Sequence, residues 1–153
     1  MEIIKINNND NYLKEYIILC NEEWGRKKSK EQLKKYIEEK IKKIHSDSKV
    51  ISILALIHND KMIGFISLFK YDGEKRKDLT PWYATMYVKK EYRNRGYSKL
   101  LNDAILKEAK TIGYKKVYLK TTLNNYYEKF GAKFYSTLDN LDNKEKIYYI
   151  EIE

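Results

Sequence analysis

The amino-acid sequence predicts an α/β domain, of the α+β kind, built around one mixed sheet that is mostly antiparallel. Three features of the sequence support this prediction. Apolar runs rich in β-branched residues, each of strand length, alternate with segments of helical periodicity. A strand, a helix and a strand follow one another in the middle of the chain, which requires a parallel pair joined by a right-handed crossover. Hairpin-like pairs of strands flank this unit and require antiparallel neighbours.

The first part of the chain predicts one short strand and two helices. Residues 2–6 alternate weakly between apolar and polar side chains, as a strand does. A helix follows, because apolar residues recur at helical spacing: Tyr12, Leu13, Tyr16, Ile17 and Cys20. Ser29 and Gln32 form a capping box, which marks the N-terminus of a second helix that ends near Ser46.

The central part of the chain predicts three strands. Residues 49–57 and 62–70 are apolar and β-branched, and Asn59-Asp60 between them is typical of a turn. The two runs therefore predict an antiparallel hairpin. The charged residues 72–80 predict a loop, and residues 82–88 predict a third strand at the centre of the sheet.

The last part of the chain predicts two helices and three strands. A helix runs from Ser98 to about Thr111, and Gly113 ends it. The remaining elements are a strand at 116–121, a short helix at 125–130, and strands at 132–138 and 146–152 that residues 139–143 join. These elements add up to about six to seven strands and about four helices. Because no repeat or boundary interrupts them, we expect one domain, residues 1–153.

The composition excludes several classes of protein. The net charge is +9, but lysine is abundant along the whole chain and acidic residues interrupt most basic runs, so we interpret the charge as composition bias and expect no nucleic-acid partner. Cys20 is the single cysteine, so no internal disulfide can form. No apolar run has the length of a membrane helix or a signal peptide. We therefore expect no membrane partner and a location in the cytoplasm.

The segment Val88–Ser98 has the composition of an anion site. A strand ends there, a loop with Gly96 follows, and an amphipathic helix begins. Such a geometry directs several backbone N–H groups toward one point, and the N-terminus of the helix adds a partial positive charge. Together they suit a pyrophosphate. Arg93 and Arg95 can add charge and forked donors.

The hexapeptide Arg93-Asn94-Arg95-Gly96-Tyr97-Ser98 resembles the acetyl-CoA-binding signature of the GNAT superfamily, in which Arg or Gln comes first and Gly or Ala last. Ser98 departs from that last position. Upstream, residues 81–88 are similar to the central strand of the family. About 30 residues downstream, Tyr126–Phe134 resembles the family's Tyr-Glu-Lys-x-Gly-Phe segment. Two motifs in the right order support the resemblance far better than either alone.

The resemblance implies a GNAT fold with a splayed central strand and a transfer of the acetyl group from acetyl-CoA to a primary amine. The amine attacks the thioester directly in a ternary complex, without a metal. Tyr127 corresponds to the acid that protonates the departing thiolate. The coenzyme-binding residues that the resemblance implies are Met86, Tyr87, Val88, Arg93, Asn94, Arg95, Gly96, Tyr97, Ser98 and Asn125.

Several points stay open at this stage. The general base is unassigned, with Asp78, Glu22 or a water chain as alternatives. A small-molecule amine is the first choice of acceptor, and a protein N-terminus or lysine the second; the candidates for an aromatic acceptor pocket are Trp24, Tyr36, Trp82 and Tyr126. An acyl-CoA-binding regulator without catalysis is the alternative function. Exposed edge strands could pair in a homodimer.

Overall fold

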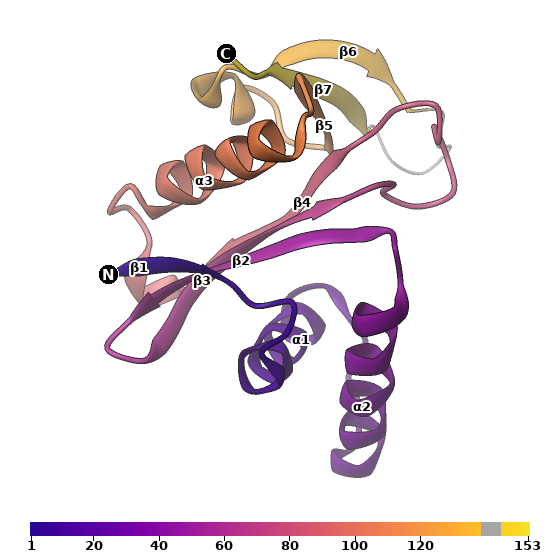
Figure 1. The fold of residues 1–153 in the computed structure, drawn as a ribbon, viewed down its shortest axis with the longest axis vertical. Helices are drawn as coiled ribbons and strands as arrows, with labels where there is room; N and C mark the ends of the chain where they lie inside the picture. Colours follow the sequence, from indigo (N-terminus) through magenta and orange to yellow (C-terminus); the bar gives the residue numbers. More distant parts are fainter. Residues whose placement is uncertain (139–144) are drawn as a thin grey trace.

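The structure, a computed structural model, describes residues 1–138 and 145–153. Within these residues, seven strands form one sheet in the order β1-β2-β3-β4-β5-β7-β6 (Figure 1). The strands are β1 (Glu2–Lys5), β2 (Val50–His58), β3 (Lys61–Phe69), β4 (Trp82–Val88), β5 (Lys116–Thr121), β6 (Lys133–Thr137) and β7 (Lys146–Glu151). The connection expected at 139–143 lies outside the described residues.

The pairing of the strands confirms a mixed, mostly antiparallel sheet. β4 and β5 are parallel, and α3 (Tyr97–Ile112) forms the crossover between them. The five other pairs of neighbours are antiparallel. β1 and β6 are the two edges of the sheet. The homodimer expected from such edges stays a prediction.

The two helices of the first part are α1 (Asp10–Trp24) and α2 (Lys30–Ser46). Ser29 and Gln32 form the expected capping box at the start of α2. Two short 3₁₀ helices, η1 (Lys90–Tyr92) and η2 (Tyr127–Phe130), complete the fold. The short helix expected at 125–130 is therefore a single 3₁₀ turn, because so few residues cannot offset the cost of nucleating an α-helix.

Helices cover both faces of the sheet (Figure 1). α3 packs on one face, and α1 and α2 pack on the other. The alternation of side chains along β2 explains this arrangement. Leu54 and Leu56 contribute to the core beneath α3, whereas Ile53, Ala55 and Ile57 contribute to the core beneath α1 and α2. The central strands are thus buried on both faces.

β4 carries a β-bulge at its centre. One residue of β3 faces two residues of β4, Thr85 and Met86. The paired positions on either side of the bulge are Phe65↔Tyr87 and Ser67↔Ala84. The φ angle of Thr85 is +51°, in the left-handed region that a β-branched residue rarely adopts.

Hydrogen bonds between buried side chains hold the bulge in place. The hydroxyl of Thr85 donates to Ser67 Oγ at 2.5 Å. The hydroxyl of Tyr16, on α1, lies 2.9 Å from Ser67 Oγ and 3.4 Å from Thr85 Oγ1. These bonds offset a backbone strain of about 1–3 kcal/mol at Thr85. α1 is therefore coupled to the conformation of the central strand.

Beyond their first residues, β4 and β5 separate. Their register has one pair, Trp82↔Tyr118, and the described residues form no further pair between the two strands. The N–H of Lys89 donates to Ile63 O on β3 at 2.9 Å. Since N–H groups alternate along a regular strand, the N–H group of Val88 points away from β3, toward the opening. This opening confirms the splayed central strand.

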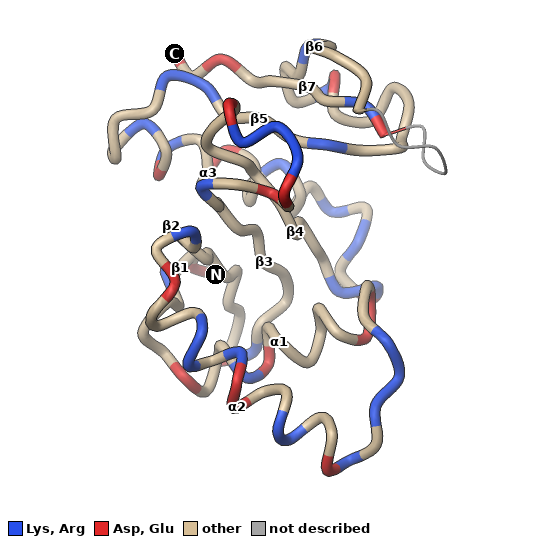
Figure 2. Tube along the Cα trace, turned by 90° about the vertical axis from the view of Figure 1, so that its right-hand side faces the viewer, with Lys and Arg blue, Asp and Glu red and all other residues tan. Residues whose placement is uncertain are grey.

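Charged residues are spread over the whole chain (Figure 2). The densest basic run, Arg26–Lys30, connects α1 to α2. Within this run, the ammonium group of Lys28 lies 4.2 Å from the ring centroid of Tyr36 and forms a cation–π contact with it. Among the helices of the described residues, none is long and apolar enough to cross a membrane.

A substitution of Gly64 tests the close approach of β3 to β4. A Cβ at Gly64 would lie 2.7 Å from Tyr87 O and 3.2 Å from Leu101 Cδ1. We expect Gly64→Ala to lower the free energy of unfolding by about 1–3 kcal/mol, because neither neighbour can move freely. Urea denaturation measures the change. A loss below about 0.5 kcal/mol would show that β4 and α3 pack less tightly here.

Candidate active site

A cleft of about 710 Å³ lies between the end of β4, the start of α3 and η2. It brings together most of the residues that the sequence motifs single out, although these residues come from two separate segments of the chain. The expected site residues that line it are Met86, Tyr87, Val88, Arg93, Asn94, Gly96, Tyr97, Ser98 and Tyr127. Arg95 and Asn125 are exposed and do not line it.

The N-terminus of α3 is built to leave its N–H groups open. Gly96 occupies the N-cap position with φ of +82°, and no side chain caps the helix. α1 and α2, in contrast, have side-chain caps from Asn9 and Ser29. A Cβ at Gly96 would meet nothing within 4 Å, so there is open space in front of the helix. The helix dipole and the free N–H groups together favour an anion at this point.

The arginines of the loop differ in their positions. Arg93 Nε donates to Val88 O at 2.9 Å, and its guanidinium lies 5.7 Å from the ring centroid of Tyr87. Arg93 thus ties the loop to the end of β4 on the side of the opening. The guanidinium of Arg95 lies 5.7 Å from the ring centroid of Tyr92, outside the lining of the cleft.

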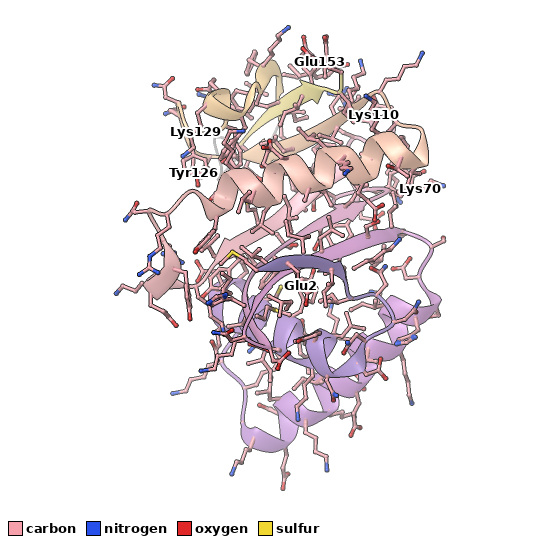
Figure 3. All side chains as sticks on the ribbon, turned by 60° about the vertical axis from the view of Figure 1, so that its left-hand side comes forward. Glu2, Lys70, Lys110, Tyr126, Lys129 and Glu153 are labelled. Atoms are coloured by element: carbon pink, nitrogen blue, oxygen red, sulfur yellow. The ribbon has the colours of Figure 1, made fainter. Side chains whose placement is uncertain are left out.

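Two lysines that are not among the expected site residues also line the cleft. Lys99 is on the first turn of α3, and Lys129 is on η2. Lys129 Nζ lies 4.0 Å from the ring centroid of Tyr126, and Figure 3 shows the two side chains beside the start of α3. Lys99 Nζ lies 2.8 Å from Asp103 Oδ2, which offsets part of its charge, and the ammonium group of Lys129 makes the cleft more favourable for phosphate.

Tyr127 lies half-buried between the cleft and the sheet. Its ring centroid is 6.1 Å from that of Tyr83 and 4.8 Å from that of Tyr126, in edge-to-face contacts. Burial, and to a smaller extent the neighbouring Tyr126, raise the pKa of Tyr127 to about 12. The hydroxyl has no hydrogen-bond partner among the described residues. It is therefore a protonated donor at neutral pH.

A second hollow, of about 360 Å³, lies at the opening between β4 and β5. Met86 and Tyr127 line both this hollow and the larger cleft, so the two are continuous. Leu119 and Lys120 of β5 line the opposite side. A long flexible ligand whose anionic end binds at α3 can therefore extend into the opening of the sheet.

Two carboxylates line this second hollow, Asp72 and Glu145. Burial raises the pKa of Asp72 above its usual range, while Lys120, whose Nζ lies 3.8 Å from Asp72 Oδ1, counteracts that rise. The negative charge of Glu145 raises the pKa of Asp72 further. An Asp with a raised pKa in a partly enclosed hollow is typical of a functional position.

The acidic residues considered from the sequence lie elsewhere. Asp78 accepts two hydrogen bonds from Arg76, both of 3.0 Å, which lower the pKa of its carboxyl. Neither Asp78 nor Glu22 lines the two hollows. Trp82 is 1% exposed, and its Nε1 donates to Leu79 O, so it belongs to the core and to no acceptor pocket.

Sequence reasoning missed Thr85 and Asp72. No pattern around Thr85 signals a positive φ, since a β-branched residue inside an apolar run predicts a regular strand. Asp72 follows a predicted strand at the start of a charged loop, where an exposed carboxylate is the ordinary expectation. A carboxylate directly after a central strand is the one signal that could have drawn attention to it.

Comparison with known proteins identifies the family to which the chain belongs. The model of the acetyltransferase (GNAT) family matches residues 11–132. The chain therefore belongs to the GNAT acetyltransferase family, whose members use acetyl-CoA. No curated protein sequence matches the chain.

Three solved structures illustrate the shared fold. An aminoglycoside 6′-N-acetyltransferase from Enterococcus faecium is similar with a TM-score of 0.71 and 19% identity, covering 100% of this chain and 98% of that one. An N-acetyltransferase from Thermoplasma acidophilum in complex with coenzyme A has a TM-score of 0.66 and 21% identity, with 99% of both chains covered. A chimera of the spermidine N-acetyltransferase from Vibrio cholerae and hSSAT has a TM-score of 0.70 and 17% identity, covering 99% of this chain and 96% of that one. At these identities the likeness concerns the fold.

A pair of substitutions at Gly96 tests the anion site. Gly96→Ala and Gly96→Glu introduce the same strain at φ of +82°, and neither Cβ meets a neighbour. Only the second places a carboxylate where a phosphate would lie. We expect Gly96→Glu to weaken acetyl-CoA binding by about 10²-fold relative to Gly96→Ala, since like charges at one site cost several kcal/mol.

Calorimetric titration with acetyl-CoA measures both affinities. Equal affinities for the two variants would mean that the phosphates bind elsewhere. A thermal melt of each variant, without ligand, serves as the control for the shared backbone strain.

Proposed function

We propose that the chain transfers the acetyl group of acetyl-CoA to a primary amine of a small molecule, by direct attack in a ternary complex. The observation that supports this proposal best is the continuity between the anion site at α3 and the opening at the bulge of β4. The two hollows share Met86 and Tyr127. A ligand with phosphates at one end and a thioester at the other suits this shape.

The coenzyme would bind along this path from its phosphates to its thioester. The N–H groups of Gly96, Tyr97 and Ser98 would donate to the pyrophosphate, and the side chains of Lys99 and Lys129 would add positive charge. The pantetheine arm would follow the end of β4. The N–H group of Val88 points toward the opening and can donate to the arm, and the N–H group of Met86, at the bulge, would donate beside it.

The thioester carbonyl would lie against the bulge. An N–H group at Met86 is held by the strand and does not need to reorganise during the reaction. It would donate to the oxygen as negative charge develops on it. The amine nitrogen would bond to the carbonyl carbon and lose a proton, the carbon–sulfur bond would break, and an amide and the thiolate of coenzyme A would result. The thiolate would then take a proton from water.

Tyr127 would donate to the departing sulfur. A free thiol has a pKa of about 8.5, below the pKa of about 12 of this phenol. Complete proton transfer to the thiolate is therefore uphill, and the main effect of Tyr127 would be a hydrogen bond that stabilises the sulfur as charge develops. The presence of this donor at the opening favours catalysis over the alternative of a non-catalytic acyl-CoA-binding regulator.

The attacking amine must lose a proton. Asp72 and Glu145 line the hollow at the opening, and Asp72 has a raised pKa. We assign to Asp72 the role of receiving this proton, directly or through water. The single cysteine, which can form no internal disulfide, is in accord with a reaction in the cytoplasm.

Removal of the Tyr127 hydroxyl tests its role. Tyr127→Phe keeps the ring contacts with Tyr83 and Tyr126, so acetyl-CoA binding should be preserved. We expect turnover to fall by about 10²–10⁴-fold. Thiol release with an amine acceptor measures turnover. Tyr126→Phe, which removes a neighbouring hydroxyl in the same cleft, is the matched control and should stay near the wild-type rate; an equal loss in both variants would remove the special role of Tyr127.

The pH dependence of the reaction gives an independent test. Burial raises the pKa of Tyr127 to about 12, so its neutral, donating form persists throughout the usual assay range. As pH rises, more amine is deprotonated while Tyr127 keeps its proton. We therefore expect kcat/KM to rise and then level off, without a fall before about pH 10.5. A decline centred near pH 10, the value of an ordinary tyrosine, would contradict this environment of Tyr127.

A further inference from the structure

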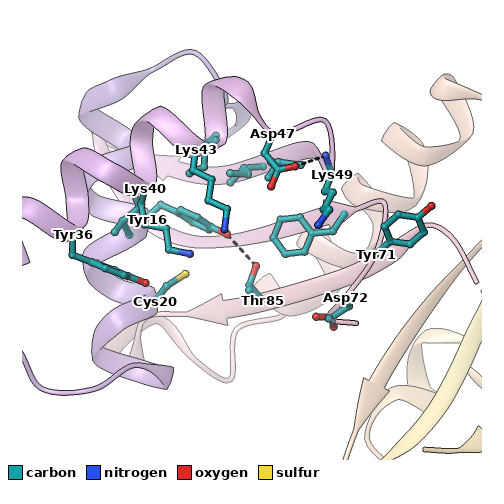
Figure 4. A pocket seen from close by; sticks show the side chains of 16 residues that line it. Tyr16, Cys20, Tyr36, Lys40, Lys43, Asp47, Lys49, Tyr71, Asp72 and Thr85 are labelled. Atoms are coloured by element: carbon teal, nitrogen blue, oxygen red, sulfur yellow. Dashed lines mark hydrogen bonds between the residues drawn. The ribbon is translucent and has the colours of Figure 1, made fainter. Parts of the chain in front are cut away.

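A third hollow, of about 410 Å³, lies on the face of the sheet that α1 and α2 cover (Figure 4). Apolar side chains from both helices and from two strands line its floor: Ile17, Ile44, Val50, Ile53 and Phe69. This hollow lies on the face of the sheet opposite to α3. It plays no part in the coenzyme path described above.

The third hollow meets the reaction centre at the bulge. Asp72 and Thr85 line both this hollow and the one at the opening between β4 and β5. The thioester would arrive at the bulge from the side of α3. A molecule in the third hollow would therefore reach the thioester from the opposite side, as direct attack requires.

The charges on the wall of this hollow are mostly positive. Lys40, Lys43 and Lys49 line it. Figure 4 shows Lys40 and Lys43 extending from α2 toward the space beside Tyr16 and Cys20. Among the described residues, the ammonium groups of Lys40 and Lys43 form no ion pair and no hydrogen bond; Lys40 Nζ lies 5.7 Å from the ring centroid of Tyr36. Ammonium groups without an ion pair, gathered on one wall of a hollow with an apolar floor, attract an anion.

Within the part of the chain that the structure describes, the acidic side chains of the hollow form no ion pair with these lysines. Asp47 accepts a hydrogen bond of 2.9 Å from the backbone N–H of Lys49. Asp72 lies beside the bulge, and its nearest cation is Lys120, at 3.8 Å. The hollow therefore has a positive wall along α2 and a carboxylate at the end next to the reaction centre.

We infer that the acceptor is a small primary amine that also carries an anionic group, a carboxylate or a phosphate. The anionic group contacts Lys40 and Lys43, the apolar part lies on the floor around Phe69, and the amine points toward Thr85 and Asp72. A polycationic acceptor is disfavoured, because it would place positive charges against unpaired lysines. This inference rests on the proposed acetyl transfer.

Matched pairs of amines test the inference. L-Phenylalanine and phenethylamine differ by a carboxylate, and O-phosphoethanolamine and ethanolamine differ by a phosphate. Spermidine represents a polycation. With acetyl-CoA as donor, we expect the anionic member of at least one pair to exceed its partner in kcat/KM by about tenfold or more, as hydrogen bonds to charged groups allow. The pair that shows the preference identifies the anionic group.

Variants of the lysines connect the preference to this hollow. Lys40→Gln and Lys43→Gln should each reduce the ratio within the pair by about tenfold. Lys42→Gln is the matched control, since Lys42 is exposed on the same helix and does not line the hollow. It should leave the ratio unchanged.

The possible outcomes separate the two proposals. The inference would be overturned if acetyl-CoA binds but neither pair shows a preference for its anionic member. Equal rates within each pair and the absence of any transfer both count as this result. So would spermidine as the best acceptor, or an unchanged ratio in Lys40→Gln and Lys43→Gln. Failure of acetyl-CoA to bind at all would instead contradict the proposed function.

Discussion

The arrangement of the site depends on the bulge of β4. Thr85, at φ of +51°, ends the regular pairing, and β4 and β5 share one pair, Trp82↔Tyr118. Without that separation, β4 and β5 would pair along their whole length, and the N–H groups of Met86 and Val88 would be taken up by hydrogen bonds between the two strands. The bulge is stable because Ser67 and Tyr16 bond to the Thr85 hydroxyl. All three hollows meet at the residues around this point, so one local irregularity connects the coenzyme side of the sheet to the acceptor side.

Much of the fold follows from local patterns in the sequence. The periodicity of α2 and α3, the capping box at Ser29 and the terminal Gly113 predict the helices, since each signal involves residues within a few positions of one another. The strands follow from apolar, β-branched runs in the same way. The short helix expected near residues 125–130 is the 3₁₀ turn Tyr127–Phe130, since so short a segment favours 3₁₀ geometry.

The site is only partly predictable in this way. The segment from Arg93 to Ser98 indicates the anion site because strand, glycine and helix are contiguous there. The conformation of Thr85 depends on Tyr16, which is 69 residues away in the sequence, and no local pattern contains that information. The same is true of the hollow beneath α2, whose charge depends on which lysines of an evenly charged helix line it. Arg95 is expected beside the phosphates from the motif, and this stays a prediction; its guanidinium lies 5.7 Å from the ring centroid of Tyr92, which lines the cleft.

The central claim is that acetyl-CoA extends from the N-terminus of α3 into the opening beside the bulge. Amide NMR spectra of the ¹⁵N-labelled protein, of 18.4 kDa, test this claim residue by residue during titration with acetyl-CoA. We expect the largest shifts at two places far apart in the sequence, the amides of Met86 to Val88 and those of Gly96 to Ser98. Titration with ATP should shift only the second group, since ATP has phosphates but no pantetheine arm. Shifts confined to the face beneath α1 and α2, with Met86 and Gly96 unchanged, would contradict the account.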